Sequence, residues 1–463
     1  MTWRTSLSER FRGFALRSGR AGAAHRVAGA AITGIALVLI GLLTLWPSSA
    51  ESVSFTPPSC VFCTEQAAVD GILNLLLFAP LGVGLSLLGF RVGAAALIAL
   101  ALTVGVEVLQ FGVVTGRDAS IADIIANGAG GILGIALGRL GGVLAGPGPR
   151  VSRLLLVVGS LVWVAVMAAA AWLMHPRFHL RTTNVLERPL SATGAQFQGR
   201  VLQATLGELE LFAGAALDGE DVRRLLLAGE EVRARIAVHE LAREQVTILK
   251  LIGPFGRELL WLGESEGALL WRAWQNSTVA HLGSTTLRLP ASAVSLGPGD
   301  TIDVHAGVDE MRLWLRVAGP GGEARREIRL SPAASWSLLL PLWDGIDAWQ
   351  RPADAAWLAL LLFPLGYWGR LAGSSRERSR SRSGALPVAV AGASVVFGLA
   401  IAPALVGSAM VGWWGWIGAL VGLALGGGVA EWVRHRMSSA GARTLDEDEA
   451  AVRSLPRFSE SPP

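Results

Sequence analysis

Three pairs of polar residues stand at helical spacing within a strongly apolar sequence, and their side chains could do chemistry together. The members of two pairs are four residues apart and those of the third are three apart, so each pair would share one face of a helix. The pairs are Asp70 and Asn74, Glu107 and Gln110, and Asp123 and Asn127, with Arg117 between the last two. Carboxylates and amides can bind amides, hydroxyls or a hard cation, and arginine can bind a phosphate or a carboxylate.

These residue types admit three interpretations. They could form a hydrogen-bond network that pins helices together within a membrane. They could instead bind a polar head group, or they could form a catalytic site. No histidine lies among them and no nucleophile–base pair is evident, which disfavours catalysis. Whether the chain is an enzyme stays open, and we expect no cofactor and no metal centre.

The elements that must position these residues are membrane-spanning helices. Hydrophobic residues make up 52% of the sequence and charged residues 16%, and the mean hydropathy is +0.48. About twenty apolar residues cross the hydrocarbon core of a bilayer. We therefore predict eight spans, at residues 27–46, 71–90, 92–112, 121–140, 154–174, 355–369, 386–406 and 411–433. The expected partners are membrane lipids and not nucleic acid, because the arginines behind the pI near 9.9 flank these spans.

The placement of arginine predicts the orientation of the spans, because positively charged loops stay in the cytoplasm. A run of arginines precedes the first span, and residues 47–69 contain no Lys or Arg. The loops expected inside carry Arg91, then Arg139 and Arg150, and finally a cluster at 370–382. We predict a multi-pass cell-membrane protein with both termini in the cytoplasm and residues 175–335 outside it. Cleavage of the first span as a signal peptide, after Ser48-Ser49-Ala50, stays open.

Around the polar pairs, over roughly residues 27–140, the sequence resembles the VanZ family of bacterial envelope proteins. The motifs that carry the resemblance are Asp70-x-x-x-Asn74-x-x-x-Phe78-x-Pro80-x-Gly82, then Glu107-x-x-Gln110, then Arg117, Asp123 and Asn127 followed by Gly130 and Gly134. The resemblance implies a bacterial cell-envelope setting and an association with low-level resistance to the glycopeptide teicoplanin. It implies no reaction, because the mechanism of the family is not established.

Cys60 and Cys63 are the two cysteines of the chain, and both fall in the first loop expected outside. Their spacing occurs in redox motifs, but the surrounding βαβ context of such motifs is missing. We predict a local disulfide in an oxidising compartment, with metal binding and free thiols as alternatives.

Residues 175–335 predict an antiparallel β-sandwich. Val232, Ile236 and Val238 alternate with arginines, as do Met311, Leu313, Leu315 and Val317, and Gly-Pro turns separate the runs. In pattern and length the segment resembles laminin-G-like and concanavalin-like domains, which implies carbohydrate binding. Trp261, Trp271 and Trp274 could stack on sugars or belong to the core.

The remaining segments complete the predicted domain order. An Arg-rich cytoplasmic tail at 1–26 precedes a four-helix VanZ-like unit at 27–140 and a single helix at 154–174. An interfacial segment at 336–353 follows the sandwich, then a three-helix unit at 355–433 and a disordered cytoplasmic tail at 438–463. Residues 361–366 echo 77–82 and residues 421–426 echo 133–138, which suggests a degenerate repeat. Glycines at 130, 134 and 138 are expected to form a packing face.

The predicted fold class is therefore an α-helical polytopic membrane protein of about eight transmembrane helices with an extracytoplasmic all-β sandwich. The favoured function is binding of a wall precursor, lipid head group or glycopeptide at an outward polar site, with a glycan held by the sandwich. An enzyme acting on a lipid-linked substrate and a transporter are the alternatives.

Overall fold

The computed structural model describes residues 19–46, 66–114, 120–178, 183–189, 195–239, 242, 244–253, 258–309, 311–340, 346–373 and 386–453. The chain divides into two units. Unit 1 comprises Met1–Gly141, Trp172–Leu330 and Ser335–Trp349, and unit 2 comprises Gly142–Ala171, Ser331–Ala334 and Gln350–Pro463. Each unit contains a helical bundle, and unit 1 also contains the β-sandwich.

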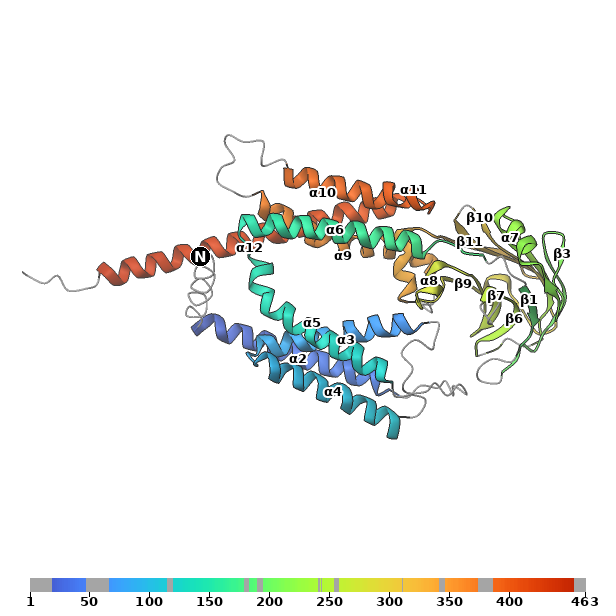
Figure 1. Cartoon of the computed structure of the whole chain (residues 1–463), viewed down its shortest axis with the longest axis horizontal. Helices are drawn as coiled ribbons and strands as arrows, with labels where there is room; N and C mark the ends of the chain where they lie inside the picture. The colour runs from blue at the N-terminus through green and yellow to red at the C-terminus, as the bar shows by residue number, and fades with distance from the viewer. Residues whose placement is uncertain are drawn as a thin grey trace, which may run out of the picture. The chain divides into compact units, whose positions relative to one another are not determined.

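Among the described residues, eight helical segments are long and apolar enough to cross a membrane, which confirms the predicted fold class. Unit 1 holds the N-terminal bundle, and most of unit 2 is the C-terminal bundle (Figure 1). The N-terminal bundle consists of α2 (Gly19–Thr44), α3 (Ala67–Leu87), α4 (Val92–Gly112) and α5 (Ile121–Ala145). The C-terminal bundle consists of α6 (Pro149–Leu173), α9 (Ile346–Ala372), α10 (Leu386–Val396) with η5 (Phe397–Ile401) and α11 (Ala402–Val406), and α12 (Trp413–Arg453).

Two predicted boundaries differ from the structure. The segment expected to lie at the membrane interface, 336–353, is helical from residue 346 and continuous with α9. Trp336, expected at that interface, is only 4% exposed. The tail expected to be disordered from residue 438 continues α12 as far as Arg453, since its alanines, glutamates and arginines favour helix.

The core of the N-terminal bundle is built from small and branched side chains that leave room for close helix packing. Phe78, Leu81 and Leu85 of α3 are buried against α2, α4 and α5. A Cβ atom on Gly130 would overlap the carbonyl oxygen of Leu75, and one on Gly134 would overlap that of Ala79. The glycine face expected on this helix therefore packs directly against the backbone of α3.

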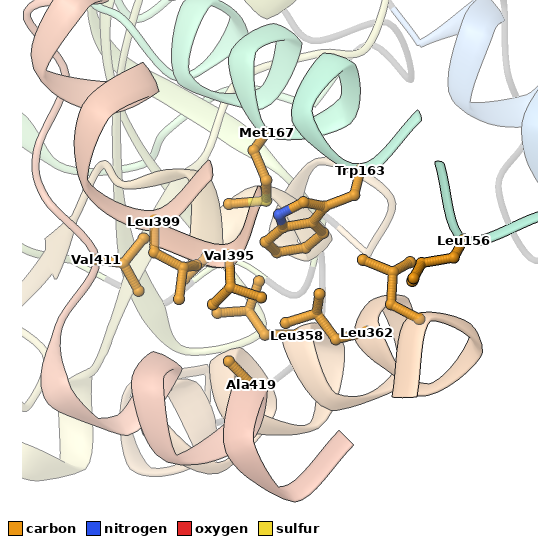
Figure 2. Packing of buried hydrophobic residues seen from close by; sticks show 11 residues of the cluster. Leu156, Trp163, Met167, Leu358, Leu362, Val395, Leu399, Val411 and Ala419 are labelled. Carbon is orange, nitrogen blue, oxygen red and sulfur yellow. The ribbon is translucent and has the colours of Figure 1, made fainter. Parts of the chain in front are cut away.

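The C-terminal bundle has a larger apolar core, to which α6 contributes (Figure 2). Trp163 and Met167 of α6 lie against Leu358 of α9 and Leu399 of η5. The Trp163 Nε1 atom donates to the Ser394 carbonyl oxygen over 2.9 Å, which satisfies the indole within this core. The helix predicted to stand alone at 154–174 is thus part of the C-terminal bundle.

The β-sandwich consists of two six-stranded antiparallel sheets in the described region, ordered β4-β1-β6-β7-β8-β9 and β12-β11-β10-β5-β2-β3. The strands are β1 (Thr183–Glu187), β2 (Arg200–Leu206), β3 (Leu209–Glu210), β4 (Ala216–Leu217), β5 (Val232–Ala237), β6 (Val246–Ile252), β7 (Glu258–Ser265), β8 (Ala268–Ala273), β9 (Thr286–Pro290), β10 (Thr301–Asp309), β11 (Arg312–Gly319) and β12 (Gly322–Arg329). Short helices α7 (Gly219–Leu227) and α8 (Asn276–Val279) lie between strands. The predicted all-β region is confirmed.

The predicted alternation in β5 and β11 is found, with one exception. Leu313, Leu315 and Val317 are 0% exposed and face the core between the sheets. Met311, expected to continue this row, precedes β11 with a φ of +62° and is only partly buried. A positive φ is typical of a turn and directs the side chain out of the strand alternation.

Candidate functional site

The predicted polar pairs lie at the end of the N-terminal bundle where α3 and α5 begin and α4 ends. Asp70 and Asn74 are on α3, Glu107 and Gln110 on α4, and Asp123 and Asn127 on α5. Arg117, expected to complete the set, lies outside the described residues. We call the six described residues the polar cluster.

Asn74 and Asp123 join α3 to α5 at the centre of the polar cluster. The Asn74 Nδ2 atom donates to Asp123 Oδ1 over 2.6 Å, and both residues are partly buried. A hydrogen bond to an ionised carboxylate is stronger than one between neutral groups. This bond therefore adds a polar contact between the two closely packed helices.

Glu107 reaches from α4 to the same place. Its Oε2 atom accepts a hydrogen bond of 2.8 Å from the backbone N–H of Ser120, the residue before α5, while Ser120 Oγ accepts one from Ala122 N–H. Glu107 is 5% exposed and lies within the range of electrostatic interaction with Asp123. Asn74, Glu107 and Asp123 are thus brought together.

Asn127 and Gln110 bind different partners. Asn127 Nδ2 donates to Thr103 Oγ1 of α4 over 2.9 Å, and Gln110 Nε2 donates to the carbonyl oxygen of Thr44 at the end of α2 over 2.9 Å. The amide oxygens of both residues are buried and accept no hydrogen bond in the described part of the chain. The polar cluster therefore links all four helices and still leaves acceptors unused.

Asp70 lies one turn beyond Asn74 and is exposed. Its side chain makes no hydrogen bond or ion pair with the described residues, and it falls in the first turn of α3. The structure therefore brings Asp70 to the rim of the polar cluster without tying it to the other members.

Three further residues that form hydrogen bonds with the polar cluster were missed in the sequence. Thr44, Thr103 and Ser120 complete the hydrogen bonds, and Thr103 is 0% exposed. Thr103 lies four residues before Glu107 on the same helix face, which is a signal that the sequence contained. Thr44 and Ser120 contribute through a backbone carbonyl oxygen and a backbone N–H, and such contributions cannot be predicted from the residue type.

Two other sets of predicted functional residues have different outcomes. Cys60 and Cys63 lie outside the described residues, so their disulfide stays a prediction. Trp261, Trp271 and Trp274 are 2%, 1% and 4% exposed, so the core interpretation of these tryptophans holds and they offer no surface to a sugar.

Comparison of the sequence with known protein families identifies a VanZ-like domain in the region that contains the polar cluster. Residues 30–142 match the family described as VanZ/LLP1, and this range covers most of the N-terminal bundle and all of the polar cluster. Neither the curated proteins nor the solved structures include a match to the chain.

Proposed function

We propose that this membrane protein with a VanZ-like domain binds the polar head group of an envelope lipid or lipid-linked wall precursor at the polar cluster. The observation that supports the proposal is an excess of acceptors. The carboxylates of Asp70 and Glu107 and two unpaired amide oxygens gather at one end of the N-terminal bundle, beside the Asn74–Asp123 hydrogen bond, and no cation pairs with Asp70 or Glu107 among the described residues. Carboxylates are costly within a membrane unless they face one another or a polar partner.

The chemistry of the polar cluster favours a ligand rich in hydrogen-bond donors. One N–H of the Asn74 amide donates to Asp123, and one N–H of the Asn127 amide donates to Thr103. Most of the remaining groups are carboxylate and amide oxygens, which accept hydrogen bonds, so amide, hydroxyl or ammonium groups complement them. Wall precursors and glycopeptides are rich in amides and hydroxyls, which connects this chemistry to the teicoplanin resistance that the family resemblance implies.

The proposal requires the polar cluster and the sandwich to lie outside the cytoplasm, where the sandwich would contact an envelope glycan. Reporter fusions at Gly267 and Ser379 test this topology. Gly267 should report the outside and Ser379 the inside. The same side for both would contradict the proposal.

Binding can be tested by native mass spectrometry of the full-length protein released from phospholipid nanodiscs. We expect a copurified lipid-linked molecule with the wild type, and its loss with Glu107→Gln or Asp123→Asn. Asp354→Asn is the matched control, because Asp354 is an acidic residue on α9 of the C-terminal bundle. Equal occupancy in all four proteins, or no bound molecule in the wild type, would contradict head-group binding.

A further inference from the structure

The sandwich contains a polar cavity that none of the predicted tryptophans reaches. The cavity has a volume of about 300 Å³ and is lined by Gly229, Glu231, Asp309, Trp314, Arg316 and Arg325. Most of these residues stand on the outer face of the sheet formed by β10, β11 and β12, opposite the core row of Leu313 and Leu315. We name it the Trp314 cavity.

Trp314 forms the floor of this cavity in a defined orientation. It pairs across the sheet with Gly307 of β10, and a Cβ atom on Gly307 would lie 2.9–3.1 Å from the indole atoms Cζ2, Cε2 and Nε1. The ring therefore lies across the glycine, close to the surface of the sheet. Trp314 is only partly buried, and its indole N–H has no hydrogen-bond partner in the described region.

The polar groups around Trp314 balance in charge. Arg325 lies 5.4 Å from the ring centroid and 3.2 Å from Glu327, and Arg316 lies 3.6 Å from Glu323. Of the cavity carboxylates, Glu231 contacts His305 at 3.1 Å. The Asp309 carboxylate is exposed and makes no hydrogen bond or ion pair with the described residues.

Glu231 is expected to remain ionised. Burial alone would raise the pKa of this carboxyl, but hydrogen bonds and charge from Arg233 and His305 outweigh burial and lower the pKa below its ordinary value. Two carboxylates therefore face two guanidinium groups across the Trp314 cavity. The carboxylates would repel a phosphate, and the guanidinium groups would repel a metal ion. The charges around the cavity therefore disfavour both kinds of ligand.

We infer that the Trp314 cavity binds a neutral sugar ring of an envelope glycan. A pyranose has an apolar face of C–H groups that matches an accessible indole, and a rim of hydroxyls that both donate and accept. Asp309 accepts from hydroxyls, while Arg316, Arg325 and the indole N–H donate to them. The volume suits a ligand of one or two sugar rings, at the lower end of the range for small-molecule sites.

This inference deepens the proposed contact between the sandwich and an envelope glycan, and it names the residues. The test uses the full-length protein in phospholipid nanodiscs, which carry no sugar head groups. The probes are N,N′-diacetylchitobiose, cellobiose and mannobiose, with glucuronate and inorganic phosphate for comparison. Isothermal titration calorimetry measures binding of each probe, and circular dichroism checks the fold of each variant.

We expect at least one neutral disaccharide to bind. Trp314→Ala should weaken it at least about tenfold, and Trp314→Phe should restore part of the affinity, because a ring is regained. Gly307→Val should weaken binding similarly without removing any group that touches the sugar, since the new side chain displaces the indole. Arg235→Ala is the matched control, because Arg235 lies on the same sheet, paired with Asp303 and away from the cavity.

Three outcomes would overturn the inference: no neutral sugar binds, only phosphate or glucuronate binds, or Trp314→Ala binds as well as the wild type. Glu107→Gln separates this inference from head-group binding. It should retain sugar affinity while losing the copurified lipid. We expect Trp314→Ala to lose sugar binding and to keep the copurified lipid, which would show that the two sites bind independently.

Discussion

The N-terminal and C-terminal bundles share one packing scheme and differ at the polar cluster. On α5, Gly130 and Gly134 approach the carbonyl oxygens of Leu75 and Ala79 of α3. On α12, Gly422 and Gly426 approach the carbonyl oxygens of Ala359 and Phe363 of α9. The two contacts of one bundle map onto the two contacts of the other with constant offsets in residue number. Positions on α3 and α9 differ by 284 residues, and positions on α5 and α12 differ by 292 residues.

The correspondence extends to the first helix of each bundle. Gly29 of α2 lies against Gly84 of α3, and Gly159 of α6 lies against Trp368 of α9, the residue that corresponds to Gly84. The first helix of each bundle therefore contacts corresponding positions of the second helix, through the backbone at Gly84 and through the Trp368 side chain in the C-terminal bundle. In the chain, the β-sandwich is inserted between α6 and α9, the first two helices of the C-terminal bundle, where the N-terminal bundle has residues 45–66.

At the corresponding positions, polar pairs become apolar ones. The Asn74–Asp123 hydrogen bond of the N-terminal bundle is replaced by Leu358 and Gly415, and a Cβ atom on Gly415 would lie 2.9 Å from Leu358 Cδ1. Asn127 corresponds to Ala419, which is 0% exposed. The C-terminal bundle shows that this packing holds without the polar cluster. Polar residues in the N-terminal bundle are therefore more than the fold requires.

The largest expected effect concerns the contacts that both bundles share. Gly134→Leu and Gly426→Leu should each destabilise the protein by about 3 kcal/mol or more, because a side chain cannot fit against the facing backbone. Thermal unfolding in detergent micelles measures the effect. Gly128→Leu and Gly428→Leu are matched controls, since a Cβ atom at either position meets nothing within 4 Å. Tolerance of Gly426→Leu alone would show that the two bundles do not depend on the same packing.

The second prediction concerns a variant in which one polar pair of the N-terminal bundle is replaced by the corresponding pair of the C-terminal bundle. Asn74→Leu combined with Asp123→Gly copies the apolar pair of the C-terminal bundle. The double variant should fold, because the C-terminal bundle does so with that pair, and it should lose the copurified head group at least about tenfold. Native mass spectrometry and thermal unfolding separate the two effects. Unchanged lipid occupancy would reduce the polar cluster to a helix-pinning network.

A third, smaller effect tests the amide on α5. Asn127→Ala should cost about 1 kcal/mol, the scale of one hydrogen bond between membrane helices. Ala419→Asn should cost about 1–3 kcal/mol, since its amide enters an apolar core. Urea or thermal titrations in micelles would compare them. A stabilising Ala419→Asn would show that the C-terminal bundle holds a polar partner for it.

The membrane spans could be predicted from the sequence because length and hydropathy alone decide them. The register of the repeat could not. The sequence echo aligned Gly422 with Gly134, whereas the contacts align Gly422 with Gly130, four residues away. Glycines recur every four residues along both helices, so a shift by one helical turn looks equally good in sequence and only the facing carbonyls distinguish the registers.

The choice of tryptophan in the sandwich shows a similar limit. Trp314 stands between Leu313 and Leu315, so strand alternation already turned it away from the core, and this signal was available. Trp261 lies within a continuous apolar run, and every residue of β7 but the last is buried. The residues around a cavity also depend on pairing between strands far apart in the chain. Glu231 precedes β5, which pairs with β10 about seventy residues later, and no local pattern contains this pairing.

The smallest effect concerns the one carboxylate that both bundles retain. Asp70 corresponds to Asp354, but Asp70 falls in the first turn of α3, whereas Asp354 lies more than one turn beyond the start of α9 at Ile346. A carboxylate in a first helical turn gains about 0.3–1 kcal/mol from the helix dipole. Asp70→Asn should therefore cost no more than about 0.5 kcal/mol, because Asp70 is exposed.

The two carboxylates should differ in binding more than in stability. If head groups enter the polar cluster past its rim, Asp70→Asn should weaken lipid occupancy a few-fold while Asp354→Asn leaves it unchanged. Occupancy by native mass spectrometry and thermal unfolding, measured on the same samples, test this. A loss of occupancy in both variants would mean that the acid acts in the C-terminal bundle too, and the division of roles between the bundles would be wrong. A loss in neither would remove Asp70 from the site and leave Asn74, Glu107 and Asp123 as its centre.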